Sequence, residues 1–190
     1  MNRRLRVILV VTLASVLAVG VAVGGCSGEP EQEGPPVGRI ISFLGSSTQG
    51  LRLGGLAPDF QFETPEGAVT SLSNLRGKAV LINFWRTQCP PCVYEMPYFQ
   101  QVYDEWSDKG LVVLAINVGE SASTTKSFLQ KYEFSLPVLL DTDGEVALGY
   151  SIQYFPSTLL VDKDGIIQGG KIGSFQSKEE IEAGIITVIP

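Results

Sequence analysis

The amino-acid sequence predicts an α/β fold in which helices cover both faces of a mixed β-sheet. Two observations support this prediction. Strand-like and helix-like stretches alternate along the chain from about residue 53 onward, and residues 111–118 form a nearly continuous run of Val, Leu and Ile. Such a run is typical of a parallel strand that is buried on both faces. Parallel strands need crossover helices, which must pack on the sheet.

The first three predicted elements are a strand, a helix and a second strand, and the two strands lie at the centre of this sheet. Residues 79–85 are a short apolar run that ends in Asn-Phe-Trp, which favours a buried strand. Residues 90–108 place apolar side chains three and four positions apart, as one face of an amphipathic helix does. Residues 111–118 then supply the central parallel strand.

The remaining predicted elements complete the alternation. Residues 123–132 have a helical pattern, and residues 136–140 are a short apolar run that predicts a strand. Residues 158–167 contain two strand-like runs joined at Asp-Gly, which predicts a hairpin. Residues 177–183 open with Ser-Lys-Glu-Glu, a pattern typical of a helix N-terminus, and predict a last helix.

The composition excludes several classes of function. The chain has 190 residues, of which 44% are hydrophobic, so it can bury a full core and is not disordered as a whole. Its formal net charge of −6 argues against binding to nucleic acid, because phosphate contacts need clustered Lys and Arg. It has no His and only three Cys, which removes imidazole bases, most zinc and copper sites, and a disulfide-stapled scaffold. We therefore expect no metal and no cofactor.

The N-terminal region is typical of a signal peptide or a membrane anchor. Three Arg within the first six residues precede an apolar run at residues 7–23. Because positive charges stay inside, the rest of the chain is expected at the extracytoplasmic face of the cell membrane. Val23-Gly24-Gly25-Cys26 resembles the lipobox of bacterial lipoproteins, which implies cleavage before Cys26 and lipidation of its thiol. An uncleaved helix is the alternative, because the apolar run is at the lower limit of length for spanning a bilayer.

A polar tether is expected between this N-terminal region and the folded domain. The stretch after Cys26 is rich in Gly, Pro and Glu and is too polar to bury. Ile40, Ile41, Phe43 and Leu44 leave an alternative open, because they can form an extra strand or pack on the domain. The predicted boundaries are residues 1–25 for the signal peptide or anchor, 26–50 for the lipidated Cys and flexible tether, and 51–190 for the folded domain.

The chemical site is predicted at Cys89-Pro90-Pro91-Cys92, where a strand ends and a helix begins. Free backbone N–H groups and the helix dipole favour a thiolate there, so the pKa of Cys89 should fall from ~8.5 toward roughly 7 or lower. Cys92 lies one turn into the helix, close enough for a disulfide and more shielded. The two Pro fit the first helical turn and stiffen it. This pattern indicates an exposed nucleophile beside a buried resolving thiol.

Two other interpretations of the cysteine pair have less support. A zinc site needs two further Cys or His ligands, and only Cys26 remains in the chain. A purely structural disulfide that bridges four residues constrains the unfolded chain little, so it would stabilise the fold little. Redox chemistry is therefore the favoured interpretation of the pair.

Several segments together carry a family resemblance. Phe84-Trp85-Arg86-Thr87-Gln88-Cys89-Pro90-Pro91-Cys92, followed by Glu95 and Pro97, resembles the active site of TlpA/ResA-type thioredoxin-like proteins of the redoxin superfamily. The matching segments together cover about residues 53–185. The resemblance implies a thioredoxin fold with a helical insertion between the central strands, and thiol–disulfide oxidoreductase activity. The other matching segments are residues 55–60, 75–78, 155–158 and 161–165.

The resemblance assigns roles to individual residues. Cys89 and Cys92 would form the redox disulfide, and Glu95 would handle the proton of Cys92, because the non-titrating Asn83 stands where thioredoxins have a buried Asp. Pro156 would be a cis-proline that presents a backbone edge to an incoming peptide. The expected substrate-binding residues are Pro156, Phe155, Trp85 and Gln88.

Two of these residues depart from the family pattern. Gln88 stands where the family commonly has Trp, and Phe155 stands where it often has Val or Thr. The first change is expected to alter the choice of partner. The second places a bulky ring beside the disulfide and is expected to alter access to the sulfur atoms and the reduction potential of the pair.

The resemblance implies an enzyme that reduces disulfides of exported proteins and is re-reduced by a membrane electron donor of the DsbD or CcdA type. Apocytochrome c before haem attachment is the best-known client of the family. Two rival functions stay open. A peroxiredoxin needs Pro-x-x-x-Thr-x-x-Cys, but Arg86 stands at the Thr position. A copper-binding assembly factor of the Sco type needs a distal His, which this chain lacks.

Overall fold

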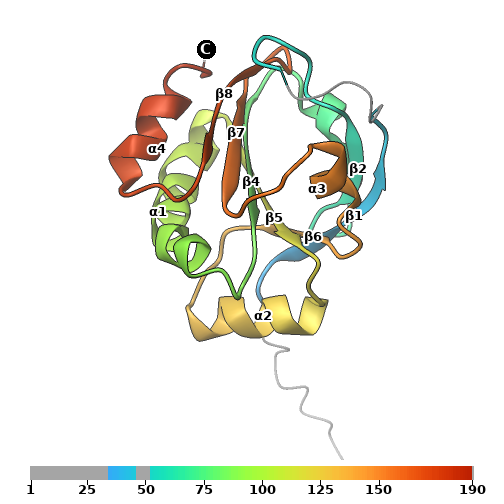
Figure 1. Ribbon diagram of the computed structural model, residues 1–190, viewed down its shortest axis with the longest axis vertical. Coiled ribbons are helices and arrows are strands. Elements are labelled where there is room, and N and C mark those ends of the chain that lie inside the picture. The colour runs from blue at the N-terminus through green and yellow to red at the C-terminus, as the bar shows by residue number, and fades with distance from the viewer. Residues whose placement is uncertain (1–33, 46–51, 190) are drawn as a thin grey trace, which may run out of the picture. The chain divides into compact units, whose positions relative to one another are not determined.

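The computed structural model describes residues 34–45 and 52–189, which belong to one unit built on a single β-sheet (Figure 1). The predicted signal peptide or anchor at residues 1–25 and the predicted lipidation site Cys26 lie outside the described residues. Within the described ranges, no helix combines the length and the apolar content that a membrane crossing requires.

The sheet is mixed. Its spatial order is β3-β2-β1-β6-β5-β4-β7-β8. The four interior neighbours β1, β6, β5 and β4 run parallel to one another, whereas the outer strands on both sides pair antiparallel. The strands are β1 (Val37–Phe43), β2 (Phe60–Glu63), β3 (Val69–Ser71), β4 (Ala79–Trp85), β5 (Leu111–Val118), β6 (Val138–Asp141), β7 (Ser157–Val161) and β8 (Ile167–Ile172).

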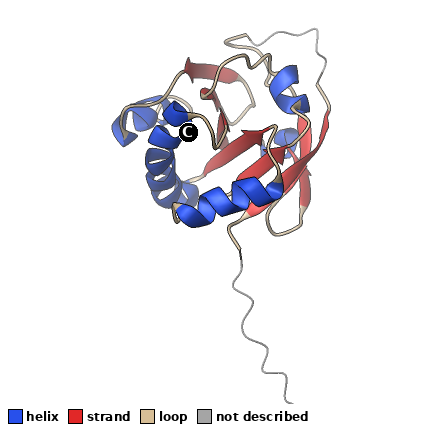
Figure 2. Cartoon of the chain, turned by 60° about the horizontal axis from the view of Figure 1, so that its bottom comes forward, coloured by secondary structure: helices blue, strands red, loops and turns tan. Residues whose placement is uncertain are grey.

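Helices cover both faces of this sheet (Figures 1 and 2). The first and last α-helices pack side by side on one face, and the short third α-helix lies over the other. The second α-helix contributes Leu129 to the same half of the core as the first. The α-helices are α1 (Pro90–Trp106), α2 (Ala122–Lys131), α3 (Glu145–Gly149) and α4 (Lys178–Ile185), and the 3-10 helices are η1 (Leu72–Leu75) and η2 (Ser107–Lys109).

The central strand β4 is buried at every position and divides the apolar core into two halves. Side chains alternate between the two faces of a strand. Leu81 and Trp85 therefore face the half under α1 and α4, whereas Ile82 and Phe84 face the half under α3. A strand packed on both faces has little freedom to move, so β4 gives a rigid base to the residues that follow it.

The predicted α/β architecture is confirmed. β4 and β5 have the bounds that the sequence predicts, and the predicted hairpin is observed as β7 and β8. The three long helices are observed within a few residues of their predicted ranges. The expected insertion between β5 and β7 contains the strand β6 as well as α2 and α3. Sequence analysis does not find β2, β3 and α3, because such short elements do not show a hydrophobic period.

The folded unit starts earlier than the predicted boundary at residue 51, which corrects that expectation. β1 lies inside the range expected to be a tether, and it takes an interior place in the sheet between β2 and β6. Phe43 at the end of β1 packs edge-on against Tyr150, with ring centroids 6.5 Å apart. It also fills the space over Gly149, where a Cβ would lie 2.3 Å from the ring. The alternative of an extra strand is the one observed.

A chain truncated to residues 51–190 should therefore fail to unfold cooperatively. Loss of β1 leaves unpaired edges on β2 and β6 in the middle of the sheet. A chain of residues 34–190 keeps β1 and should retain the thermal transition of the full chain. Circular dichroism melts of the two truncated chains test this expectation. Closely similar melting temperatures for both would contradict the structural role of β1.

Candidate active site

The cysteine pair lies where β4 leads into α1, as predicted. Cys89 is the N-cap residue of α1, and Pro90 and Pro91 begin the helix. The two cysteines form a disulfide, with Cα atoms 5.2 Å apart. The backbone N–H of Cys92 donates to Sγ of Cys89 at 3.3 Å. A free N–H of the helix terminus thus points at this sulfur, which is the arrangement that stabilises a thiolate once the disulfide is reduced.

The two cysteines differ in their access to solvent. Cys92 is fully buried, whereas Cys89 is partly exposed and is flanked by the exposed residues Gln88, Pro90 and Pro91. A partner protein can therefore reach Cys89, while Cys92 stays behind it. This difference suits one attacking thiol and one resolving thiol.

The peptide bond between Phe155 and Pro156 is cis, as the family resemblance implies. The next residue, Ser157, pairs with Phe84 in the sheet, so Pro156 lies beside the end of β4. The guanidinium of Arg86 lies over the Phe155 ring, with its Cζ 4.4 Å from the centroid. The loop that leads to the cysteines and the loop that leads to β7 therefore touch through this pair.

Trp85 is not placed as expected for a substrate-binding residue. Its side chain is 0% exposed and packs against Phe128, with ring centroids 5.4 Å apart. It supports the site from beneath and presents no surface to a docked protein, which corrects that expectation. Gln88 is exposed beside Cys89 and is free to contact a partner.

A buried polar cluster lies on the α1 side of β4. Glu95 is one helical turn beyond Cys92, and its carboxyl accepts hydrogen bonds from the Asn83 side-chain amide and from the Phe175 backbone N–H, each at 2.9 Å. The Asn83 amide also donates to the hydroxyl of Thr158 on β7, at 3.0 Å. All three polar side chains are almost completely buried. The cluster thus ties β4, α1, β7 and the loop before α4 together.

The environment of Glu95 suits proton exchange at neutral pH. Burial raises the pKa of Glu95 to about 7, although the hydrogen bonds from Phe175 and Asn83 and the charge of Lys171 oppose that rise. Loss of water is therefore the dominant effect on the carboxyl. A group with a pKa near neutrality can both take up and release a proton under physiological conditions. The chain has no His, and Glu95 lies one helical turn beyond Cys92, so it is the candidate for this capacity at the site.

A second carboxylate braces the loop that leads into Cys89. Glu120 accepts hydrogen bonds from the backbone N–H and the hydroxyl of Thr87, at 2.8 and 2.7 Å, and from the side-chain amide of Asn117, at 2.7 Å. The Thr125 hydroxyl in turn donates to Asn117, at 3.0 Å. Sequence analysis does not find this brace. The sequence does contain a signal for this contact. β4 and β5 are parallel, so Thr87 and Glu120, which follow these two strands, lie at the same edge of the sheet.

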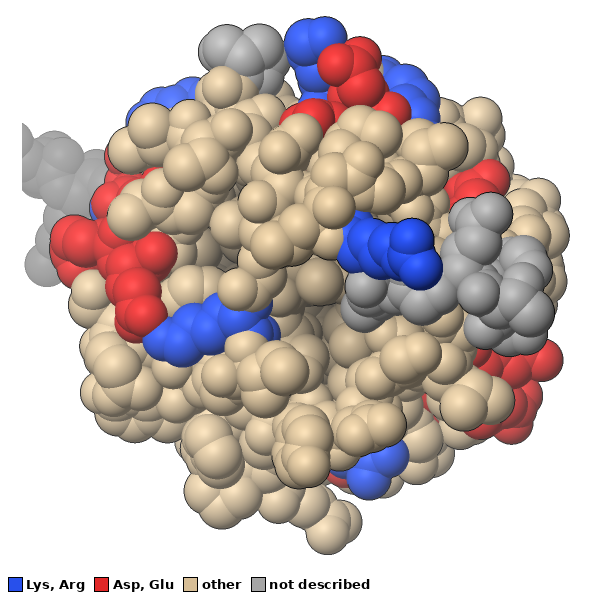
Figure 3. Space-filling view, turned by 45° about the horizontal axis from the view of Figure 1, so that its top comes forward, with Lys and Arg blue, Asp and Glu red and all other residues tan. Residues whose placement is uncertain are grey.

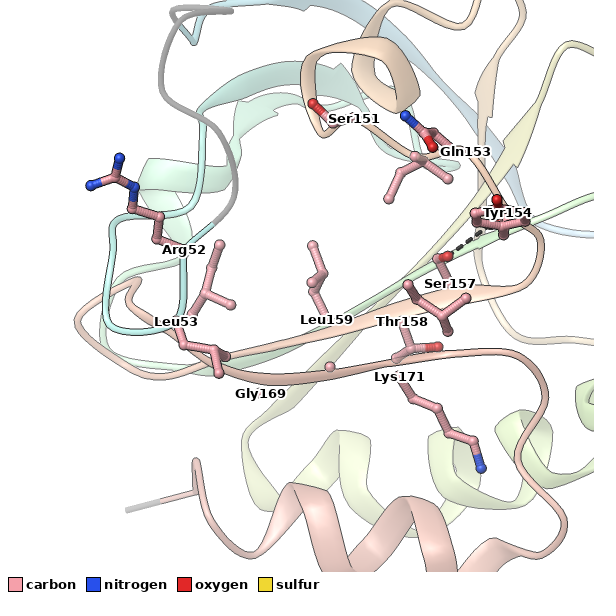
Figure 4. Close-up of a pocket in the computed structure, with 14 residues that line it drawn as sticks. Arg52, Leu53, Ser151, Gln153, Tyr154, Ser157, Thr158, Leu159, Gly169 and Lys171 are labelled. Carbon is pink, nitrogen blue, oxygen red and sulfur yellow. Dashed lines mark hydrogen bonds between the residues drawn. The ribbon is translucent and has the colours of Figure 1, made fainter.

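An open groove of about 510 Å³ lies against β7 and β8 (Figure 4). Leu53 and Leu159 face each other across it, and Tyr154 and Ser157, on either side of the Phe155–Pro156 peptide, line one part of it. None of the described residues that line it is a cysteine. The surface turned forward in Figure 3 is mostly uncharged, with scattered charged side chains. The groove therefore adjoins the loop that carries the cis-proline without containing the sulfur atoms.

Comparison with known proteins identifies the family. The family model described as AhpC/TSA matches residues 53–169. A protein from Bacillus cereus named thiol-disulfide oxidoreductase ResA is 34% identical over 146 residues, which cover 76% of this chain and 83% of that protein. This chain belongs to the AhpC/TSA family, among the ResA-type thiol–disulfide oxidoreductases.

Solved structures agree with this membership. A thiol:disulfide interchange protein of the thioredoxin family from Chlorobium tepidum gives a TM-score of 0.63 at 28% identity, over 75% of this chain and all of that one. The exposed lipoprotein thioredoxin of Streptococcus pneumoniae gives 0.59 at 26% identity, over 68% of this chain and 98% of that one. The predicted thioredoxin fold is confirmed, and the chain is a thiol–disulfide oxidoreductase of ResA type.

The buried carboxyl should make the stability of this ResA-type oxidoreductase depend on pH. The folded state holds the proton of Glu95 up to about pH 7, whereas the unfolded state releases it near the ordinary pKa of 4.5. The folded state thus binds more protons in this window, so the free energy of unfolding falls as pH rises, by up to about 3 kcal/mol. Glu95→Gln cannot ionise and should abolish that contribution.

Urea unfolding of the parent and of Glu95→Gln at about pH 5 and about pH 8 measures this difference. The variant should gain stability relative to the parent at the higher pH. Glu66→Gln is the matched control, because Glu66 is exposed, and it should behave like the parent. An identical pH dependence in the parent and Glu95→Gln would show that the carboxyl does not titrate in this range.

Proposed function

We propose that this protein reduces disulfides of exported proteins at the extracytoplasmic face of the cell membrane, with Cys89 and Cys92 as its redox pair. The observation that carries the proposal is the placement of the two sulfurs. Cys89 is partly exposed at the N-cap of α1, and Cys92 is fully buried behind it. Family membership supports the class of chemistry, and this difference in access supports the order of attack.

The proposed reaction has two exchange steps. The Cys89 thiolate attacks one sulfur of a client disulfide, which forms a mixed disulfide and releases the other client sulfur as a thiolate. Cys92 then gives its proton to the Glu95 carboxylate and attacks Cys89. This step releases the second client sulfur and closes the Cys89–Cys92 disulfide. The client gains two electrons and the protein loses two, so we propose that a membrane donor of the DsbD or CcdA type restores the dithiol.

Client docking is proposed around the exposed edge of the disulfide. Pro156 is buried, has no N–H, and its carbonyl already accepts a hydrogen bond from the Gly173 backbone N–H at 2.9 Å, so its cis bond would shape the loop, and Phe155 and Gln88 would contact the client. Both Phe155 and Gln88 have exposed surface, and they lie in the two loops that touch through Arg86 and Phe155. The proposed client class, apocytochrome c before haem attachment, is supported by the family resemblance.

Replacement of Cys89 by Ser should abolish the reduction of insulin disulfides, because no attacking thiolate remains. Cys92→Ser should also lose turnover, but it should accumulate a mixed disulfide, because Cys89 can still attack. Insulin precipitation assays with a chemical reductant, followed by non-reducing gels, distinguish the two. Cys26→Ser, which leaves the redox pair intact, is the control and should keep activity. Sustained turnover by Cys89→Ser would refute the assignment.

We further propose that Cys26 carries a lipid after cleavage of the signal peptide. The lipobox-like residues 23–26 support this proposal. The exposed lipoprotein thioredoxin of Streptococcus pneumoniae supports it as well, because that similar protein is described as a lipoprotein. A lipid at this position would hold the thioredoxin domain outside the membrane on the stretch that follows Cys26.

In cells that express the full chain, Cys26→Ser should lose incorporation of a labelled fatty acid and should accumulate as the uncleaved precursor. Fatty-acid labelling and mass spectrometry of the N-terminus measure both effects. The parent should carry the label and begin at Cys26. A parent protein that keeps residues 1–25 and takes up no label would instead support the uncleaved helix.

A further inference from the structure

The polar cluster next to the resolving cysteine contains a residue that the proposed reaction does not use. Asn83 donates one N–H to Oε1 of Glu95 at 2.9 Å and the other to the hydroxyl of Thr158 at 3.0 Å. Its Oδ1 atom is buried and has no hydrogen-bond partner among the described residues. Buried polar atoms without a partner are rare, because they lose their hydrogen bonds to water without replacement.

The charge of the partner explains why the amide points this way. The orientation of the amide suits the ionised form of Glu95, because an ionised carboxylate can only accept hydrogen bonds and Asn83 presents its N–H groups to it. Thr158 takes the second N–H and holds the amide in this orientation, which leaves Oδ1 unpaired. A Leu of similar shape would leave no unpaired oxygen at this position. Packing alone therefore does not explain why an Asn stands at this position, whereas its hydrogen bond to Glu95 does.

We propose that Asn83 is a positioning residue for proton transfer at Glu95: its amide, held by Thr158, fixes the carboxyl one helical turn from Cys92 and favours the ionised form. This inference rests on the proton-accepting role proposed for Glu95. A hydrogen bond donated to the charged form opposes the effect of burial and lowers the pKa of Glu95. Without the amide, the carboxyl would hold its proton to a higher pH and would be a poorer acceptor at neutrality.

Other groups face Glu95 and set the background for this effect. Lys171 on β8 favours the carboxylate, and Glu180 on α4 disfavours it. These two side chains form an ion pair with each other, so their effects on Glu95 partly cancel. The backbone N–H of Phe175 holds the second oxygen, Oε2. Asn83 is neutral, so it orients the carboxyl without adding a second titration to the cluster.

The experiment follows the release of a client thiol from a preformed mixed disulfide on Cys89, by rapid mixing, between about pH 5.5 and about pH 9. In the full-length parent, the rate should fall as pH drops through the pKa of Glu95. In Asn83→Leu, this fall should move to higher pH by about one unit, with roughly fivefold slower release near neutrality. Thr158→Val keeps the shape of the side chain, removes the hydroxyl, and should give a smaller shift in the same direction.

A double-mutant cycle separates positioning from a merely structural role. In Glu95→Gln, Cys92 must give its proton to solvent, so release should be slower and should rise steadily with pH without a break near the pKa of Glu95, and adding Asn83→Leu should then cause no further change in the pH profile. An unshifted profile in Asn83→Leu, with the break near the pKa of Glu95 present in the parent and absent in Glu95→Gln, would overturn the inference alone. A break at the same pH and an undiminished rate in Glu95→Gln would overturn the proposed role of Glu95 and the inference with it. Should Asn83→Leu not fold, an unshifted profile in Thr158→Val overturns the inference.

Discussion

β4 is buried along its whole length and pairs with β5 on one side and β7 on the other. Its position in the sheet sets the positions of three parts of the site. The end of β4 sets where α1 starts, and therefore where Cys89 meets the helix N-terminus. The pairing with β7 brings the cis-proline loop beside the cysteines. Strand alternation turns Asn83 inward, toward the helix that carries Glu95. The reactive groups thus stand on rigid elements and depend little on loop conformation.

The electrostatics of the site follow from the same burial. A carboxyl placed in the core loses its hydration, which raises its pKa to about 7, the range in which the proposed proton acceptor of a chain without His has to work. The free-energy cost of burying the ionised carboxyl is partly offset by the hydrogen bonds that the Asn83 amide and the Phe175 backbone N–H donate to it. Outside the core, Glu120 is held by several donors and serves to brace Thr87. The buried carboxyl of Glu95 and the partly exposed carboxyl of Glu120 therefore take different roles, set by their surroundings.

The sequence predicts the features that rest on local pattern. β4 and β5 are long, apolar runs, and the spacing of Cys89 and Cys92 at a strand–helix junction is itself a chemical signature. Long-range contacts are harder to predict. Thr158 and Phe175 reach the cluster from distant parts of the chain, and no local pattern indicates that they meet Asn83 and Glu95. β1 is found only as one of two alternatives, because its apolar residues follow a polar, Pro-rich stretch that favours a tether. The inward position of Trp85 does follow from strand alternation, once β4 is assigned.

The central claim is that two sulfurs at the start of α1 act together as a reductant. The equilibrium reduction potential of the Cys89–Cys92 pair, measured against glutathione, tests it most directly. The account predicts a strongly reducing value, close to that of thioredoxin at about −270 mV. A value close to that of the oxidant DsbA, at about −120 mV, would contradict the account and would make the protein a donor of disulfides.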